Sequence, residues 1–138
     1  MADIEAIAAD IIDAAYRLHC DIGPGLLESV YENILAVKLV QRGHSVVQQC
    51  PIDIEYDGLR FQAAFRADII VDERVLVEVK SIERLTAVHG KQVLTYLRLL
   101  KQPLGLLINF GGATLKEGLR RIVNDHKPLA SSRLRVNL

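Results

Sequence analysis

Hydrophobic residues in the first 18 positions recur at intervals of three and four, which is the spacing of one face of an amphipathic helix. The repeating positions are Ile4, Ile7, Ala8, Ile11, Ile12, Ala15 and Leu18. A second helical pattern starts at the turn Gly23-Pro24-Gly25 and continues to Gly43, whose missing Cβ suits the end of a helix. Two helices are therefore predicted before the first strand.

The middle of the chain has the pattern of paired strands. Residues 45–56 and 59–71 are predicted to form a hairpin, because Asp57-Gly58 between them tolerates the positive φ of a tight type I′ turn. A second turn at Asp72-Glu73-Arg74 leads into a third strand with the sequence VLVEVKSI.

The last third of the chain combines helix and strand. Residues 89–101 are typical of a third helix that ends before Pro103, and residues 104–110 form a continuous apolar run typical of a buried strand. Residues 114–124 fit either a short helix or an edge strand, and fraying is expected beyond Asp125. The predicted order of elements is ααβββαβ.

Length and composition indicate one globular domain over residues 1–138. Of the 138 residues, 50% are hydrophobic and 25% are charged. No apolar stretch approaches the ~20 residues of a bilayer span, and the acidic start MADIEAIAAD differs from the basic start of a signal peptide. We therefore expect a cytoplasmic protein with no membrane contact. Cys20 and Cys50 have no second Cys or His at finger spacing, which argues against a structural zinc site.

Charge is balanced over the chain but not along it. The 17 basic residues equal the 17 acidic ones, so the usual signature of a nucleic-acid-binding chain is missing. Residues 1–32 nevertheless hold seven acids against one base, and residues 116–138 hold six bases against two acids. This basic C-terminal segment, including the tail 125–138, could lie along a phosphate backbone or form a solvated tail.

Three charged residues stand on two adjacent predicted strands in the stretch FRADIIVDERVLVEVKS. Glu78 and Lys80 are two residues apart and must project from the same face. If the turn is centred on Glu73, Asp68 lies directly opposite Glu78, with Cβ atoms about 4.5 to 5.5 Å apart. A two-residue turn would instead pair Asp68 with Val77 and place the two acids on opposite faces.

Two neighbouring carboxylates in apolar surroundings repel each other unless a cation or a proton relieves them. Hard oxygen ligands suit Mg²⁺ or Mn²⁺, which bind through one or two carboxylates together with substrate phosphate. Such a metal would polarise a phosphodiester and lower the pKa of a bound water, while Lys80 could orient that water. The alternative is a solvent-facing Glu/Lys pair on a strand edge, which is the usual explanation of short D…ExK matches.

Polar residues on the two flanking helices could complete such a site. Glu28 and Glu32 share one face of the second helix with Gly25, so Glu28 could supply a third carboxylate or only favour the positive end of the helix dipole. In the third helix a polar stripe could meet phosphates or could simply pack. Its members are His89, Gln92 and Tyr96.

Several of these segments together resemble the GxxExxY proteins of bacteria and archaea, which belong to the PD-(D/E)XK nuclease-like superfamily. The stretch GLLESVY, from Gly25 to Tyr31, fits the pattern that names the family. The match continues in the correct order through His19, FRAD, VEVKS, VHGKQVLTYL and GLLINFG, over roughly residues 4–124. One departure is Ala67, which stands where the superfamily has a proline that neither ligates metal nor transfers protons.

The resemblance implies an α/β fold with a restriction-endonuclease-like core, in which a central mixed β-sheet is flanked by helices. It implies that Asp68 and Glu78 bind the metal, with the Val79 carbonyl as a further ligand, and that Lys80 is the catalytic lysine. Glu28 would be the acid contributed by the preceding helix.

The resemblance also implies a set of residues that position the substrate. Gln92 and Tyr96 match the QxxxY helix motif of RecB-like exonucleases. Tyr31, beside the acidic face of the second helix, and His89, on the polar stripe of the third, are added to the predicted set from their positions. The predicted function is Mg²⁺- or Mn²⁺-dependent hydrolysis of phosphodiester bonds, in DNA. Two alternatives stay open: a nuclease-like fold that serves as a binding or assembly module, and a nuclease active only with a protein partner or as a homo-oligomer.

Overall fold

The computed structural model describes residues 3–125, and five strands in this range form one sheet in the order β1-β2-β3-β4-β5. Strands β3 and β4 run parallel, and every other neighbouring pair is antiparallel. The strands are β1 (Val46–Tyr56), β2 (Leu59–Val71), β3 (Val75–Lys80), β4 (Leu104–Asn109) and β5 (Leu119–Val123). The predicted α/β fold with a central mixed sheet is confirmed.

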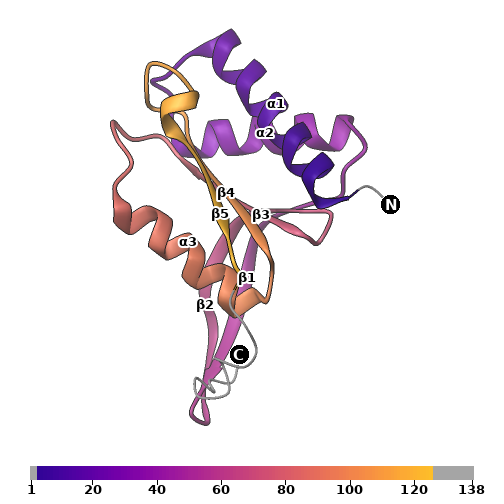
Figure 1. Cartoon of the computed structure of the whole chain (residues 1–138), viewed down its shortest axis with the longest axis vertical. Helices are drawn as coiled ribbons and strands as arrows, with labels where there is room; N and C mark the ends of the chain where they lie inside the picture. The colour runs from indigo at the N-terminus through magenta and orange to yellow at the C-terminus, as the bar shows by residue number, and fades with distance from the viewer. Residues whose placement is uncertain (1–2, 126–138) are drawn as a thin grey trace.

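Helices cover both faces of this sheet (Figure 1). Helices α1 (Ile4–Ile22) and α2 (Glu28–Gln41) pack on one face, and α3 (Ala87–Leu100) packs on the other. A short 3-10 turn, η1 (Lys116–Gly118), precedes β5, so the edge strand is the correct alternative for residues 119–123. Within residues 3–125, no helix combines the length and the apolar character that crossing a membrane requires.

The ends of the first two helices follow from local chemistry. The Asp3 carboxylate accepts a hydrogen bond from the Ala6 amide at 2.9 Å and so caps α1. The second helix was predicted to start at the Gly23-Pro24-Gly25 turn, but in the structure it starts several residues later. Gly23 and Gly25 have φ values of 81° and 115°, which lie outside the helical region, so α2 begins only at Glu28.

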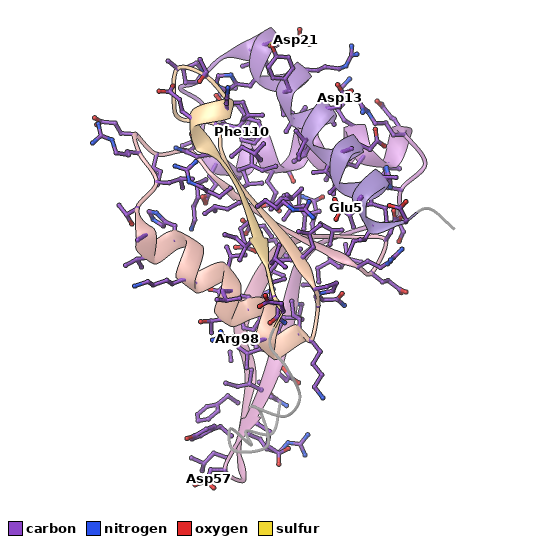
Figure 2. The ribbon with its side chains drawn as sticks, in the orientation of Figure 1. Glu5, Asp13, Asp21, Asp57, Arg98 and Phe110 are labelled. Atoms are coloured by element: carbon purple, nitrogen blue, oxygen red, sulfur yellow. The ribbon has the colours of Figure 1, made fainter. Side chains whose placement is uncertain are left out.

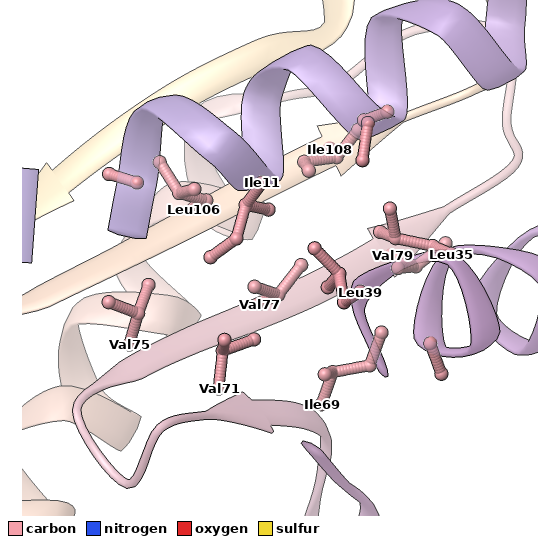
Figure 3. Packing of buried hydrophobic residues seen from close by; sticks show 14 of the residues in the cluster. Ile11, Leu35, Leu39, Ile69, Val71, Val75, Val77, Val79, Leu106 and Ile108 are labelled. Carbon is pink, nitrogen blue, oxygen red and sulfur yellow. The ribbon is translucent and has the colours of Figure 1, made fainter. Parts of the chain in front are cut away.

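Strand β3 is buried on both faces and contributes residues to both core clusters. Val75, Val77 and Val79 belong to the core cluster under α1 and α2, whereas Leu76 belongs to the cluster under α3. Figure 3 shows the first cluster, with Ile11, Leu35, Leu39, Leu106 and Ile108 around these valines. Because each fully buried aliphatic side chain contributes about 1.5 to 3 kcal/mol, this strand fixes the position of the residues that follow it.

The two hairpins have the turns that the sequence predicted. At the tip of the β1–β2 hairpin, which projects beyond the rest of the sheet, Asp57 and Gly58 have φ values of 52° and 81°, as a type I′ turn requires (Figure 2). The β2–β3 hairpin pairs Ile69 with Val77 and Val71 with Val75. The turn is therefore centred on Glu73, and the prediction of that register is confirmed.

His44 links helix α1 to the turn between β2 and β3. Its Nδ1 lies 2.6 Å from Asp72 Oδ2, and its Nε2 lies 2.5 Å from Asp10 Oδ2. Arg42 also contacts Asp10, with Nη1 at 2.6 Å from Oδ1. Burial lowers the pKa of His44, but the hydrogen bonds to Asp10 and Asp72 outweigh that effect, so the net pKa is raised. The protonated ring therefore holds two segments of the chain together.

We expect His44→Gln to lower the free energy of unfolding by about 1 to 2 kcal/mol at pH 6, and by much less at pH 9. The folded pKa is raised above the ordinary value of 6.5, so the stabilisation is complete below that value and is lost as pH rises through the folded pKa. Urea unfolding of both proteins at the two pH values measures the difference. An equal loss at both would contradict the charged link.

Candidate active site

Asp68 and Glu78 lie where strands β2 and β3 separate. The regular pairing of the two strands ends at Ile69 and Val77. Beyond that point the Asp68 amide donates to Glu78 Oε2 at 3.0 Å, and the Val79 amide donates to Asp68 Oδ2 at 2.9 Å. The two carboxylates thus replace the backbone acceptors of a regular sheet, and each is held in place by the opposite strand.

This arrangement makes both acids harder to ionise. Burial raises the pKa of Glu78 to about 8, and the nearby Asp68 carboxylate adds to the rise. Burial also raises the pKa of Asp68, against the hydrogen bond from Val79, which lowers it. Glu78 is only 5% exposed. A proton or a cation between the two groups would relieve this repulsion.

Lys80 and Glu28 lie within electrostatic range of this pair. Lys80 follows Glu78 by two positions on β3, and its ammonium lowers the pKa of Glu78, Asp68 and Glu28. Glu28 is the first residue of α2. Burial raises the pKa of Glu28, and the charge of Asp68 adds to that rise. The structure therefore brings three predicted acids and the predicted lysine together from three different elements.

Glu32 is a further acid at this site to which the sequence analysis gave no role. It lies one turn after Glu28 on α2 and is only 6% exposed. Its charge raises the pKa of Asp68, Glu78 and Glu28, which places it in the same electrostatic cluster. The available signal in the sequence was the spacing of four residues from Glu28 along a helix.

Helix α3 brings Tyr96 within electrostatic range of the acids. Burial raises the pKa of Tyr96, and the charges of Glu78 and Asp68 add to that rise. The Tyr96 ring stacks on Phe65 of β2, with a centroid separation of 4.0 Å, and this contact orients the ring. Gln92 lies one turn earlier on the same helix and is exposed.

His89 caps the first turn of α3. The Thr86 amide donates to His89 Nδ1 at 2.9 Å, as part of a capping box. Because an imidazole nitrogen that accepts a hydrogen bond carries no proton, this contact places the proton of the neutral ring on Nε2. The polar stripe predicted for this helix thus includes one residue with a clear structural role.

Tyr31 is placed differently from the prediction. It is fully buried, at 0% exposure, which does not fit direct contact with a substrate. Its hydroxyl donates to the Gly23 carbonyl at 2.5 Å and accepts from the Leu26 amide at 3.2 Å, while its ring stacks on Phe110 at 4.6 Å. Tyr31 therefore holds the loop that leads into Glu28.

The comparison with protein-family models matches residues 5–122 to the model described as the PD-(D/E)XK nuclease superfamily. The chain belongs to this superfamily. Comparisons with curated proteins and with solved structures find no significant match. Members of the PD-(D/E)XK superfamily are generally nucleases and typically use divalent metals. The narrower assignment to the GxxExxY proteins stays a prediction.

The acids gathered at this candidate site fit a hard divalent cation. Residues 3–125 contain no ready-made group of three or more His, Cys, Asp or Glu side chains that could hold a metal ion. Mg²⁺, however, is usually bound through one or two carboxylates and keeps several waters. Asp68 and Glu78 supply such a pair, and only Oε2 of Glu78 accepts a hydrogen bond from the described part of the chain. The second oxygen of Glu78 is thus available to a ligand.

We expect Tyr31→Phe to lower the free energy of unfolding by about 1 to 3 kcal/mol, because it leaves the Leu26 amide and the Gly23 carbonyl without a partner. Tyr56→Phe is the matched control, because Tyr56 is 57% exposed and its change should stay within about 0.5 kcal/mol. Chemical denaturation measures both values. Similar losses from the two variants would contradict the loop-holding role.

We expect Glu78→Gln to be more stable than the wild type at pH 9, by at least about 1 kcal/mol, and similar to it at pH 4. The folded pKa of Glu78, about 8, is raised above the ordinary value of 4.5. The stability contributed by the neutral acid is therefore complete below the ordinary value and is lost as pH rises through the folded value. Chemical denaturation of both proteins in EDTA measures the difference without metal. A wild type as stable as Glu78→Gln at pH 9 would refute the prediction.

Proposed function

We propose that this protein is a nuclease that hydrolyses phosphodiester bonds of DNA with the help of Mg²⁺ or Mn²⁺. The observation that carries the proposal is the bridged pair Asp68 and Glu78 at the point where β2 and β3 separate, with Lys80 beside it. Membership of the PD-(D/E)XK superfamily supports the same chemistry.

The metal would be held by Asp68 and Glu78, with the Val79 carbonyl as a further ligand and Glu28 as an acid from α2. When bound, the cation polarises the phosphodiester and lowers the pKa of a water. Lys80 orients that water and offsets the negative charge that develops on the phosphate oxygens.

Three residues of α3 are proposed to position the nucleic acid. The Tyr96 phenol stays neutral, because burial raises its pKa, and so it can donate a hydrogen bond to a phosphate oxygen. Gln92 can donate from its amide one turn earlier. His89 can donate from Nε2, because Nδ1 already accepts from Thr86.

A second candidate function is a nuclease-fold module that binds or assembles without turnover. It is favoured by the zero net charge of the chain. It is also favoured because residues 3–125 contain no group of three or more His, Cys, Asp or Glu side chains arranged to hold a metal ion. A third is a nuclease that needs a protein partner or a second copy to form a surface that attracts DNA. The basic tail, which was predicted to lie along a phosphate backbone or to form a solvated, frayed end, falls outside the described residues from 126 onward.

We expect the purified protein to cleave end-labelled single- or double-stranded DNA in the presence of Mn²⁺. Asp68→Ala and Lys80→Ala should each lower the cleavage rate about 100-fold or more, because each removes a group that stabilises the transition state. Asp21→Ala and Lys38→Ala are matched controls, because both residues are exposed and lie outside the site. Gel analysis of the products measures the rates.

Equal cleavage by wild type, Asp68→Ala and Lys80→Ala would assign the activity to a contaminant. Calorimetric titration with Mn²⁺ separates the remaining cases, because binding that is lost in Glu78→Ala is expected of the enzyme and not of a metal-free module. Light scattering during chromatography tests for self-association. A protein that binds no Mn²⁺ and cleaves no DNA would favour the module.

A further inference from the structure

The backbone of β1 has an unusual conformation at Gln49, opposite Asp68. Strands β1 and β2 pair regularly on either side, with Gln48 opposite Ile69 and Cys50 opposite Ala67. Gln49 itself has a φ of 50°, in the left-handed region that non-glycine residues rarely adopt. Such a conformation costs about 1 to 3 kcal/mol and persists only where the surrounding structure determines it.

The amide of Gln49 joins two carboxylates of the site. Its Nε2 donates to Glu32 at 2.9 Å to Oε1 and 3.1 Å to Oε2, and to Asp68 Oδ1 at 3.2 Å. The other oxygen of Asp68 accepts from the Val79 amide. Asp68 is therefore held at both oxygens, by a side chain of β1 and by the backbone of β3, and its carboxylate plane is fixed.

Glu32 anchors this contact from α2. It is 6% exposed, and its Oε2 also accepts from the amide of Gln48 at 3.1 Å. Among residues 3–125, Glu32 forms no salt bridge, so both of its oxygens are satisfied by amides and not by a cation. A buried carboxylate held in this way sets the direction of the Gln49 amide.

We infer that Gln49 is a positioning residue that orients Asp68 for the metal, with Glu32 as its anchor. The inference rests on the proposed nuclease function. It adds two residues to the site, Gln49 and Glu32, that were not among the predicted site residues. Carboxylates that bind metals are themselves hydrogen-bonded by neighbouring side chains, whose loss typically weakens metal affinity about 10- to 100-fold. Without the Gln49 amide, Asp68 can rotate away from the position that faces Glu78.

The test compares Gln49→Met with Gln48→Met by calorimetric titration of the full chain with Mn²⁺. Gln49→Met keeps the length of the side chain but removes the donor to Asp68, so the dissociation constant should rise about 10- to 100-fold. Gln48 contacts Glu32 and Asn33 but not Asp68, so Gln48→Met should stay within about threefold of the wild type. Wild-type affinity in Gln49→Met, or equal losses in both variants, would overturn the inference.

Cleavage assays provide a second readout that a purely structural role would not move. If Gln49 acts through metal binding, raising the Mn²⁺ concentration should restore the cleavage rate of Gln49→Met. A rate that stays low at saturating Mn²⁺ would overturn the inference. If Gln49→Met does not fold, Gln49→Asn replaces it, because Asn tolerates the left-handed region but is too short to join both carboxylates.

Glu32→Gln distinguishes an anchor from a ligand. Its amide oxygen can still accept from Gln49, so Mn²⁺ affinity should fall no more than about threefold. A loss as large as that of Asp68→Ala would make Glu32 a ligand and overturn its role as an anchor. A wild type whose Mn²⁺ binding does not depend on Asp68 would refute the proposed function itself, whereas normal binding in Gln49→Met alone refutes only this inference.

Discussion

The exchange of hydrogen bonds between Asp68 and the end of β3 is the constraint on which the site depends. Where β2 and β3 separate, each strand presents an amide that needs an acceptor, and the carboxylates of Glu78 and Asp68 supply it. The same exchange brings the partly buried Asp68 and the buried Glu78 close together, and burial raises the pKa of Glu78 to about 8. The fold thus keeps two mutually repelling carboxylates close together, and a bound cation would relieve this repulsion.

Hydrogen bonds of neighbouring segments fix the chain around the carboxylate pair. Tyr31 fixes the loop before Glu28, and the Ser81 hydroxyl donates to the Leu26 carbonyl at 2.7 Å, which ties the same loop to the end of β3. On the other side, the buried Asn109 side chain bonds the amide and the carbonyl of Ile82, both at 2.9 Å. The chain after Lys80 is therefore fixed by the Asn109 side chain of β4 and by its own Ser81 hydroxyl, which bonds the loop before α2, and not by regular sheet pairing.

Local patterns predicted the elements and their register but not all the roles of their side chains. The odd-numbered turn at Glu73 was enough to place Asp68 opposite Glu78, because hairpin register follows from the length of the turn. Tyr31 and His89 were assigned to the substrate from their positions beside polar residues. In the structure the buried Tyr31 holds a loop, and Nδ1 of His89 caps helix α3, which leaves Nε2 for the proposed contact with nucleic acid. These roles depend on which neighbour accepts or donates the hydrogen bond.

The sequence by itself determined the order of helices and strands, the two turns and the carboxylate pair, because periodicity, turn chemistry and hairpin register depend on residues close together in the chain. Only the tertiary structure decided that Glu28 and Glu32 of α2 lie within electrostatic range of Asp68, and that Gln49 joins Glu32 to Asp68, from 17 and 19 residues away. The packing of α2 on the sheet sets those contacts. The position of α2 on the sheet cannot be predicted from a local pattern, because it results from the fit of side chains across the whole core.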